Sequence, residues 1–536
     1  MTSAGRLRIA ALVLPVLGGC ALVLGFEDTT LRTGDGGASD DADLGIDGAS
    51  LDGAPSRLST EPTSIVVRRG TTTQVKVTLD RGSDVSGAVT AKLDELPMGV
   101  TSAPATIAEG STSTTLDVVA AADAPYGSSN VELSVDVPGL PPLSLSLLVA
   151  GVAGAIDTSF DGDGFIADAT RGAIATFYAL AIQPDGKIVA AGVGTAGVGN
   201  QTGWFVKRFN VDATPDATFT TNAAAAVPVN GNARAIAIDA QGKIVLCGTS
   251  GTGAGAQLTL VRLDAEGKID PTFATGTVKL VAGDAPLGST GAGVAIAPNG
   301  DIVAVGTRAE LQDSTGVVMR FKANGTRDPT FNGGAVLLVP KARLFSAAIE
   351  AQGAIITGGT NNAGAATSYV VTKRLPTGAA DQTFGAAGVA NFGAGLRARA
   401  FVRLPDGTFF LAGDATQPAN QYSAGLTNAA GAQIFARAIG PGANAGYFAA
   451  APGGEGRILV AGHTGPPNGE ARVDRLFPDA GRDTSFGTQG TAVIEPGGLA
   501  NGFDVTLFAL GSQTDGRILV AGNKTNAGAV IYRLWP

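Results

Sequence analysis

The sequence predicts an all-β protein: an immunoglobulin-like β-sandwich followed by a seven-bladed β-propeller that an N-terminal outer strand closes. Two glycines at a fixed separation recur seven times along the chain, and short alternating strands precede them. The first piece of the repeat region also matches what the last copy lacks. We expect a signal peptide at 1–19, an acidic tether at 20–57, the sandwich at 58–151 and the propeller at 152–536.

The N-terminus has the pattern of an export signal. Arg6 and Arg8 precede the apolar run Ile9–Leu17, and Gly18-Gly19 stand directly before Cys20. A basic start, a short apolar run and small residues at a cleavage point are typical of signal peptides. Small residues that end on a cysteine resemble a bacterial lipobox. The resemblance implies that Cys20 becomes the mature N-terminus and carries acyl chains that hold the protein to a membrane.

The alternative for this segment is an uncleaved membrane anchor. Ile9–Phe26 is 18 residues long without a charge, which is just enough to span a bilayer. Pro15 and the glycine pair weaken it as a helix, so the lipoprotein interpretation is favoured. By the same resemblance, Ala21 after the cysteine implies the outer membrane, with the protein facing the periplasm or the cell surface.

The next 30 residues predict a flexible linker. Glu27–Ser56 is rich in Gly, Asp, Ala and Ser and shows no apolar periodicity. Such segments stay extended and disordered because they cannot bury apolar surface. A calcium-binding tract is the alternative, but no EF-hand spacing is present.

The region before the repeats predicts a small β-sandwich. Turn residues separate its alternating segments, and about seven short strands in about 90 residues are typical of immunoglobulin-like folds. The predicted strands are Ser64–Val67, Gln74–Leu79, Ala88–Leu93, Thr114–Val119, Asn130–Val135 and Leu143–Val149. The phrases at Leu96–Val100 and Ala105–Gly110 resemble bacterial Ig-like modules of surface proteins, which implies a spacer or an adhesive module.

The repeat is the main evidence for the larger domain. In each copy a strand, a turn, a glycine, a second strand and a second glycine follow one another, and the two glycines are six residues apart. The first glycines are Gly186, Gly242, Gly300, Gly353, Gly407, Gly456 and Gly516, and the second are Gly192, Gly248, Gly306, Gly359, Gly413, Gly462 and Gly522. Antiparallel hairpins repeated every 55 residues or so predict the blades of a propeller.

The first copy illustrates the predicted blade, and the two ends of the region predict ring closure. The four strands of the first copy are expected at Ala179–Gln183, Lys187–Val193, Trp204–Asn210 and Ala223–Val229.

The last copy stops after its third strand, Ala529–Leu534, whereas the region begins with an unpaired segment at 157–167. We expect Gly164–Ala167 to supply the missing outer strand, because closure removes the free edges of an open array.

The phrase Gln183–Gly192 and the segment Asp157–Phe160 resemble the delta-60 repeat family of bacterial secreted and surface proteins. The resemblance covers about 157–535 and implies a propeller with no common enzymatic activity.

One charged pair recurs in the repeats. An arginine ends the third strand and an aspartate follows seven or eight residues later, and both are missing together at Gly425 and Ala432 in the fifth copy. Joint loss favours a structural ion pair over a ring of ligand-binding arginines. The arginines are Arg208, Arg262, Arg320, Arg374, Arg475 and Arg533, and their partners are Asp216, Asp270, Asp328, Asp381, Asp483 and Asp157.

Other candidate chemistry has a simpler structural interpretation. Asp161–Gly164 with Asp168 loosely suggests a calcium loop, but other copies lack the second acid, so a turn is favoured. The only histidine, His463, is expected in a solvated turn, and Cys247 in the core. One aromatic per copy is expected to pack between blades: Phe160, Phe219, Phe273, Phe331, Phe384, Phe435 and Phe486.

The sequence indicates the function of the protein only in outline. The net charge of −9 argues against nucleic-acid binding, which needs a basic footprint. We find no catalytic residue, no metal ligands and no cofactor motif, so we expect a monomeric, non-catalytic module that binds a protein or glycan on a propeller face. A lyase or glycosidase with a channel-face active site, and a structural or adhesive surface component, remain the alternatives.

Overall fold

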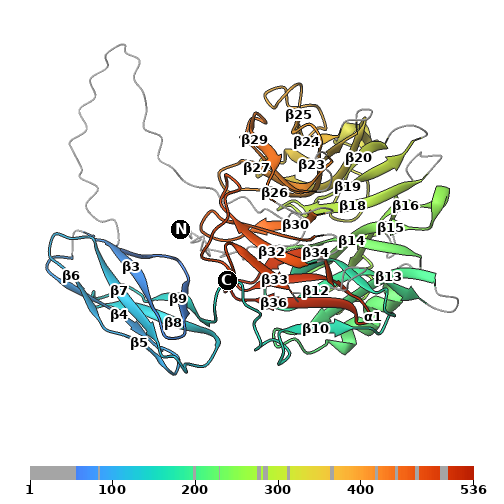
Figure 1. The fold of residues 1–536 in the computed structure, drawn as a ribbon. Coiled ribbons are helices and arrows are strands. Elements are labelled where there is room, and N and C mark those ends of the chain that lie inside the picture. The colour runs from blue at the N-terminus through green and yellow to red at the C-terminus, as the bar shows by residue number, and fades with distance from the viewer. Residues whose placement is uncertain are drawn as a thin grey trace, which may run out of the picture. The chain divides into compact units, whose positions relative to one another are not determined.

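The computed structural model describes residues 56–82, 85–196, 201–227, 230–274, 279–281, 288–310, 314–362, 367–416, 421–440, 445–464, 470–494 and 505–536. They form two compact units, which are 56–155 with 535–536, and 156–534 (Figure 1). Strands dominate both units, so the all-β prediction is confirmed. Cys20, the predicted signal peptide and all but the last two residues of the predicted tether lie outside the described residues. Within the described residues, no helix is long and apolar enough to cross a membrane.

The first unit consists of two sheets that share one hydrophobic core. One sheet has the order β1-β3-β7-β5 and the other β2-β9-β8-β4-β6. The strands are β1 (Arg57–Glu61), β2 (Ile65–Arg68), β3 (Thr72–Asp80), β4 (Val89–Asp94), β5 (Val100–Ser102), β6 (Ala105–Ile107), β7 (Ser113–Ala120), β8 (Gly127–Val135) and β9 (Leu143–Ala150). All six predicted strands are present, and three short ones are added.

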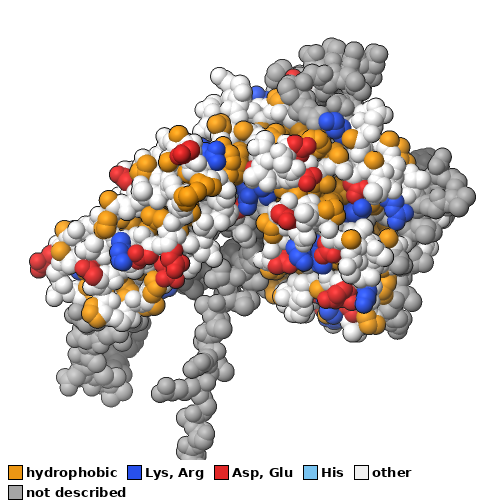
Figure 2. Space-filling model, turned by 90° about the horizontal axis from the view of Figure 1, so that it is seen from below, with side chains coloured by type: hydrophobic (Ala, Val, Ile, Leu, Met, Phe, Trp, Pro, Cys, Tyr) orange, Lys and Arg blue, Asp and Glu red, His pale blue; other side chains and the backbone are white. Residues whose placement is uncertain are grey.

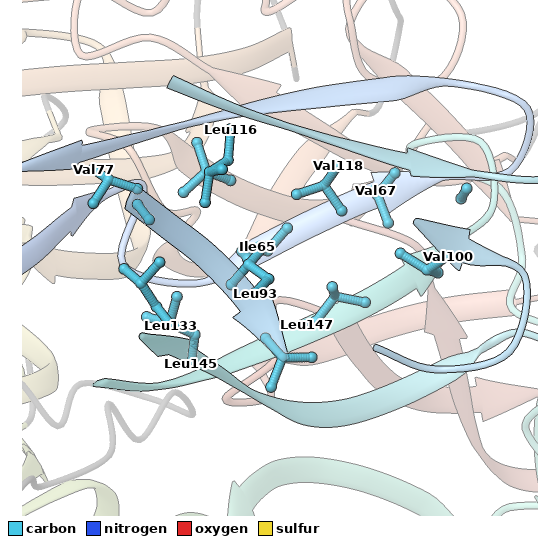
Figure 3. Packing of buried hydrophobic residues seen from close by; sticks show 14 of the residues in the cluster. Ile65, Val67, Val77, Leu93, Val100, Leu116, Val118, Leu133, Leu145 and Leu147 are labelled. Carbon is cyan, nitrogen blue, oxygen red and sulfur yellow. The ribbon is translucent and has the colours of Figure 1, made fainter. Parts of the chain in front are cut away.

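The core of this unit follows from alternation along its strands. Buried and exposed residues alternate in β7, so Leu116 and Val118 point inward while their neighbours face solvent. Figure 3 shows these residues meeting Leu133 and Leu147 from the other sheet. Strands β2 and β9 pair in parallel, and the remaining pairs of the unit are antiparallel.

The last two residues of the chain belong to this first unit. Trp535 is buried against Leu148 and Ala150, and its ring lies 4.9 Å from that of Tyr126. Gly151 leaves room for the indole, because a Cβ at this position would overlap the Trp535 ring. The C-terminus therefore contributes to the packing of a unit that otherwise lies before residue 156.

The second unit contains seven antiparallel sheets, numbered here in chain order. Sheet 1 is β11 (Thr176–Ile182), β12 (Ile188–Ala196) and β13 (Gln201–Phe209); sheet 2 is β14 (Gly231–Ile238), β15 (Ile244–Ser250), β16 (Gln257–Leu263) and β17 (Lys279–Val281); sheet 3 is β18 (Ser289–Ile296), β19 (Ile302–Ala309), β20 (Ser314–Phe321) and β21 (Leu337–Val339). Sheet 4 is β22 (Ala342–Ile349), β23 (Ile355–Asn361), β24 (Ser368–Arg374) and β25 (Val389–Phe392). Short 3-10 turns lie at Gly253–Gly255 and Asn332–Gly334.

The last three sheets repeat the pattern. Sheet 5 is β26 (Leu396–Arg403), β27 (Phe409–Ala415), β28 (Gln421–Thr427) and β29 (Gln433–Ala438); sheet 6 is β30 (Gly446–Pro452), β31 (Ile458–His463), β32 (Ala471–Leu476) and β33 (Thr491–Ile494); sheet 7 is β34 (Val505–Ser512), β35 (Ile518–Lys524), β36 (Gly528–Leu534) and β10 (Phe165–Asp168). We call the first strand of each numbered sheet its leading strand. Each leading strand contacts that of the next sheet, and β34 of sheet 7 contacts β11 of sheet 1.

The first strand of the repeat region completes the last sheet, as predicted. Strand β10 pairs antiparallel with β36, with Phe165 opposite Tyr532 and Asp168 opposite Ala529. Buried residues from both ends of the region share one core, including Phe160, Phe177 and Ile531. The predicted outer strand at Gly164–Ala167 is therefore confirmed to within one residue.

The fourth strand predicted for the first copy, Ala223–Val229, is wrong. Helix α1 occupies Ala217–Ala226 instead. Asp216 caps it by accepting a hydrogen bond from the Phe219 amide, and the run Ala223–Ala226 favours a helix because alanine has the highest helix propensity. Sheet 1 consequently has three strands.

The repeated phenylalanines pack as expected. Six of the seven are buried, and Phe435 is half-buried. In sheets 1 to 4, each such ring lies under a left-handed turn glycine of the following sheet, as Phe219 does under Gly267. A side chain on that glycine would collide with the ring, so the turn and the ring between sheets constrain each other.

Candidate functional site

The repeated arginine and aspartate form a local cluster after the third strand. Arg262 donates from Nε to Asp270 at 2.8 Å and from Nη2 to the Thr272 hydroxyl at 3.1 Å. Its guanidinium lies 4.7 Å from the centre of the Phe273 ring. The Asp270 amide in turn donates to the Arg262 carbonyl, so backbone and side chains fix the same turn.

The structure brings five of the six predicted pairs together. In each, the guanidinium also stacks on the phenylalanine that follows the aspartate. The pairs are Arg208–Asp216 at 2.8 Å, Arg262–Asp270 at 2.8 Å, Arg320–Asp328 at 2.5 Å, Arg475–Asp483 at 3.0 Å and Arg533–Asp157 at 2.6 Å.

The sixth predicted pair, Arg374 with Asp381, is wrong. Lys373 takes the position of the arginine: it pairs with Ile356 across the sheet, and its ammonium lies 3.7 Å from Asp381. Side chains alternate faces along a strand, so Arg374, one residue further, points away from that carboxylate. The eight-residue spacing of the other described pairs within a sheet would have identified Lys373.

Sheet 5 lacks the Arg–Asp pair, as expected. The residues that stand in the places of the arginine and the aspartate are, however, not the predicted Gly425 and Ala432. Leu426, and not Gly425, pairs with Phe410 and so occupies the place of the arginine. Ala432 does not take the place of the aspartate either, because its amide donates to the turn residue Asn428. In this sheet Arg437 of β29 reaches the following sheet and donates to the Asp479 carbonyl at 2.9 Å.

Three of the arginines also connect neighbouring sheets. Arg208 donates to the Ala265 carbonyl of sheet 2 at 2.6 Å, and Arg262 donates to the Ala323 carbonyl of sheet 3. Arg533 of sheet 7 donates to the Val211 carbonyl of sheet 1 at 3.3 Å. Guanidinium donors engaged on all sides are unavailable to a ligand, which favours an architectural role for this cluster. Figure 2 shows Lys and Arg interspersed with Asp and Glu on the face in view.

These contacts make the stability of the unit depend on pH. Burial alone would raise the pKa of Asp483, but hydrogen bonds from Ser485 and Arg457 and the charge of Arg475 lower it to about 2. The pKa values of Asp270 and Asp328 are lowered as well: burial again raises them, and hydrogen bonds from lysine and threonine outweigh it. A depressed carboxyl pKa contributes stability that is present above the unfolded value and disappears as the pH falls through the folded value.

We therefore expect the free energy of unfolding to decrease as the pH falls from about 5 to about 2. Urea unfolding at a series of pH values measures this decrease. Asp483→Asn removes one of the titrating groups and should flatten the curve, whereas Asp161→Asn, at an exposed turn, should leave its shape unchanged. An Asp483→Asn curve parallel to that of the unaltered protein would contradict the assignment.

The second repeated glycine marks a β-bulge in every leading strand. Opposite each of these glycines the register between the leading strand and its neighbour shifts by one residue. A Cβ on Gly192 would overlap the Thr176 carbonyl oxygen, and the other six glycines face an equivalent carbonyl. The glycine therefore makes room for the extra residue, as bulges require a locally altered backbone.

The bulged residues were not predicted, although the spacing of the glycines locates them. Their flanking residues are buried, whereas the bulged side chains are partly or fully exposed. They are Tyr178, Arg234, Ala292, Phe345, Arg399, Phe448 and Phe508. The backbone is thus repeated, and the side chain differs from sheet to sheet.

Five bulged residues form a continuous chain of contacts, the bulge cluster. The Tyr178 and Phe508 rings lie 5.0 Å apart, and the Phe508 and Phe448 rings 5.5 Å apart. The guanidinium of Arg234 lies 3.9 Å from the centre of the Tyr178 ring, and that of Arg399 lies 4.8 Å from the Phe448 ring. The cluster crosses sheets 2, 1, 7, 6 and 5 and so joins both ends of the repeat region.

An open pocket of about 200 Å³ adjoins the Arg399 end of this cluster. Arg397, Arg399 and Asp414 line it together with Phe448 and His463. Asp414 is buried and accepts from Arg397 at 2.7 Å and from Arg399, whose side chain is 38% exposed. Because two arginines share one carboxylate, this group has a net charge of +1, so the pocket suits an anion.

His463 does not lie in a solvated turn, and that prediction is wrong. It ends β31, is only 9% exposed, and stacks on Phe448 with the ring centres 4.8 Å apart. Burial and then the charge of Arg399 lower its pKa to about 4, so the imidazole is neutral at pH 7. It contributes a flat face to the pocket wall.

Two other candidate residues, Cys247 and Asp168, have contacts that indicate a structural role. Cys247 lies in the core as predicted, and burial raises the pKa of its thiol to about 12. Asp168 is held by Lys207 at 2.7 Å and by Thr170. Among the described residues, no group of three or more His, Cys, Asp and Glu side chains could hold a metal ion.

Comparison with known proteins finds a match to three segments of the repeat region. A family model described as "Domain of unknown function (DUF5122) beta-propeller" matches residues 183–219, 241–273 and 297–331. The chain carries a β-propeller-type repeat domain. A solved structure of the surface layer protein SbsC, domains 4-9, is 12% identical, with 90% of this chain and 81% of that chain covered and a TM-score of 0.15. No curated protein matches the chain.

Proposed function

We propose that the chain is a non-catalytic cell-envelope lipoprotein that presents a seven-bladed, closed propeller of the delta-60 type as a binding or scaffolding module. The cyclic contacts among the leading strands support the ring, and so does the pairing of β10 with β36. The two-sheet unit before it would be an Ig-like spacer that follows the tether and the lipidated Cys20.

The observation that carries a binding function is the contrast between two repeated positions. The Arg–Asp pairs keep the same chemistry in most sheets, and their donors are engaged in architecture. The bulged positions keep the same backbone but carry Tyr, Arg, Ala or Phe. A common backbone with variable, exposed side chains is the arrangement of a recognition surface on a rigid scaffold.

A hydrolase would need acids where the binding surface is proposed. The seven leading strands, all of which are described, contain no Asp or Glu, and the one carboxylate that lines the pocket, Asp414, is paired with Arg397 and Arg399. Glycosidases use a pair of carboxylates across the scissile bond. The composition of these strands therefore supports binding over catalysis.

The anchor can be tested in cells. Cys20→Ala in the full chain should move the protein from the membrane fraction to the soluble fraction, because the acyl chains supply the proposed attachment. Immunoblots of fractionated cells measure this, and Cys247→Ala serves as the control for loss of a cysteine. If the Cys20 variant stayed in the membrane fraction, this result would contradict the lipoprotein assignment. Protease treatment of whole cells then separates a surface location from a periplasmic one.

A further inference from the structure

The leading strands carry a charge pattern opposite to that of the whole chain. The protein has a net charge of −9, but its seven leading strands hold five arginines and no acid. Arg234, Arg343, Arg397 and Arg399 lie in the first half of their strands, at the end where the bulges occur. The positive charge is thus concentrated at one end of these strands.

We propose that the bulge cluster and its adjoining pocket bind an acidic glycan, a linear saccharide that carries carboxylates, as in uronic acids. This inference rests on the proposed binding function and specifies its ligand class. Arg399 marks one end of the cluster and Arg234 the other, with the three aromatic rings between them.

The two arginines are positioned for carboxylates. Arg399 lies against Phe448, donates from Nε to Asp414 and lines the pocket with a side chain that is 38% exposed. Arg234 lies over Tyr178, donates from Nε to Asn232 at 2.9 Å, and is exposed. A guanidinium held on a ring loses little further freedom on binding and presents a planar, bidentate fork to a carboxylate.

The aromatic residues between them suit the body of a sugar. Tyr178, Phe448 and Phe508 are partly exposed and form a row across three adjoining sheets. Binding sites for small molecules combine such aromatic lining with a few convergent polar groups. Asp414 and the neutral His463 add polar atoms to the pocket wall at the Arg399 end.

An acidic peptide that binds as an added strand fits this surface less well. A peptide that adds as a β-strand needs a regular edge, and a bulge in every leading strand interrupts the edge where it would pair.

The test is calorimetric titration of the full chain, extracted in detergent, with an oligogalacturonate and with a neutral galactan oligosaccharide of equal length. Polyglutamate and single-stranded DNA are titrated in parallel. We expect the acidic saccharide to bind at least about tenfold more tightly than the other three. Arg399→Gln and Arg234→Gln should each weaken it by about tenfold, since each removes one charge-assisted contact.

The control is Arg327→Gln, an exposed arginine in the turn after the third strand of sheet 3, which should bind like the unaltered protein. Arg234 has no acidic partner among the described residues, so its variant reports on binding even if Arg399→Gln affects folding. Equal affinity for the neutral saccharide, tighter binding of polyglutamate or DNA, or unaltered binding by both variants would overturn the inference. If no saccharide binds while Cys20→Ala still releases the protein, the ligand class is wrong and the envelope assignment stands.

Discussion

Replacing Asp157 with alanine is expected to lower the free energy of unfolding of the repeat unit by about 3–5 kcal/mol, the usual cost of breaking a buried ion pair. Asp157 is fully buried and accepts from Arg533 Nε at 2.6 Å, and Arg517 lies 3.6 Å away. Without the carboxylate, the buried Arg533 guanidinium loses its acidic partner, whereas Arg517 keeps its own partner Asp515. The pair also joins residues 376 positions apart, so its loss should loosen the junction of sheet 7 with the start of the region.

Urea unfolding of the full chain measures this loss. Asp212→Ala is the matched control, because Asp212 holds a similar turn through Thr214 but is exposed, and its loss should cost under about 1 kcal/mol. The double variant with Arg533→Met should recover part of the stability, since it removes the stranded charge. Simple additivity of the two single effects would show that the residues are not coupled.

Adding one methyl group at Gly306 should destabilise the repeat unit by about 3 kcal/mol, at the upper end of the usual cost of overpacking. The new Cβ would overlap the Thr290 carbonyl oxygen, a rigid backbone atom, and would lie 3.1 Å from the Gly291 Cα. Strand β18 would have to give up its bulge or separate from β19. Gly306 lies in sheet 3, outside the bulge cluster, so the effect reports on architecture alone.

Thermal and urea unfolding of Gly306→Ala test this expectation. Gly255→Ala is the control: nothing lies within 4 Å of its added Cβ, and its backbone is not left-handed, so stability should change by less than about 0.5 kcal/mol. Equal stability of the two variants would mean that the repeated glycine is not required by the bulge.

The architecture could be predicted because its signals are local. An Asp-Gly turn between alternating apolar segments defines a hairpin within some 20 residues, and the same signal recurs in seven copies. The match between 157–167 and the segments that follow the third strand located the pairing of β10 with β36, because the last copy ends after its third strand and lacks such a segment. The missed helix α1 follows the same logic, since the alanine run and the Asp216 cap were both visible in the sequence.

A register error of one residue accounts for the wrong pair. Arg374 and Lys373 are adjacent, and only the cross-strand partner Ile356 shows which one faces Asp381. A strand alternates its faces every residue, so an alignment that is acceptable for placing a strand is too coarse for placing a side chain.

From the sequence alone came the strands, the seven copies, the pairing of the two ends and five of six Arg–Asp pairs, all of which depend on turn chemistry and alternation within a few residues. The candidate binding surface needed the tertiary structure. Arg234, Tyr178, Phe508, Phe448 and Arg399 come from five sheets, and they meet only because those sheets pack against one another. His463 likewise becomes a buried pocket wall through Phe448 of the neighbouring strand. Contacts of this kind are set by the packing of whole sheets, which local sequence does not encode.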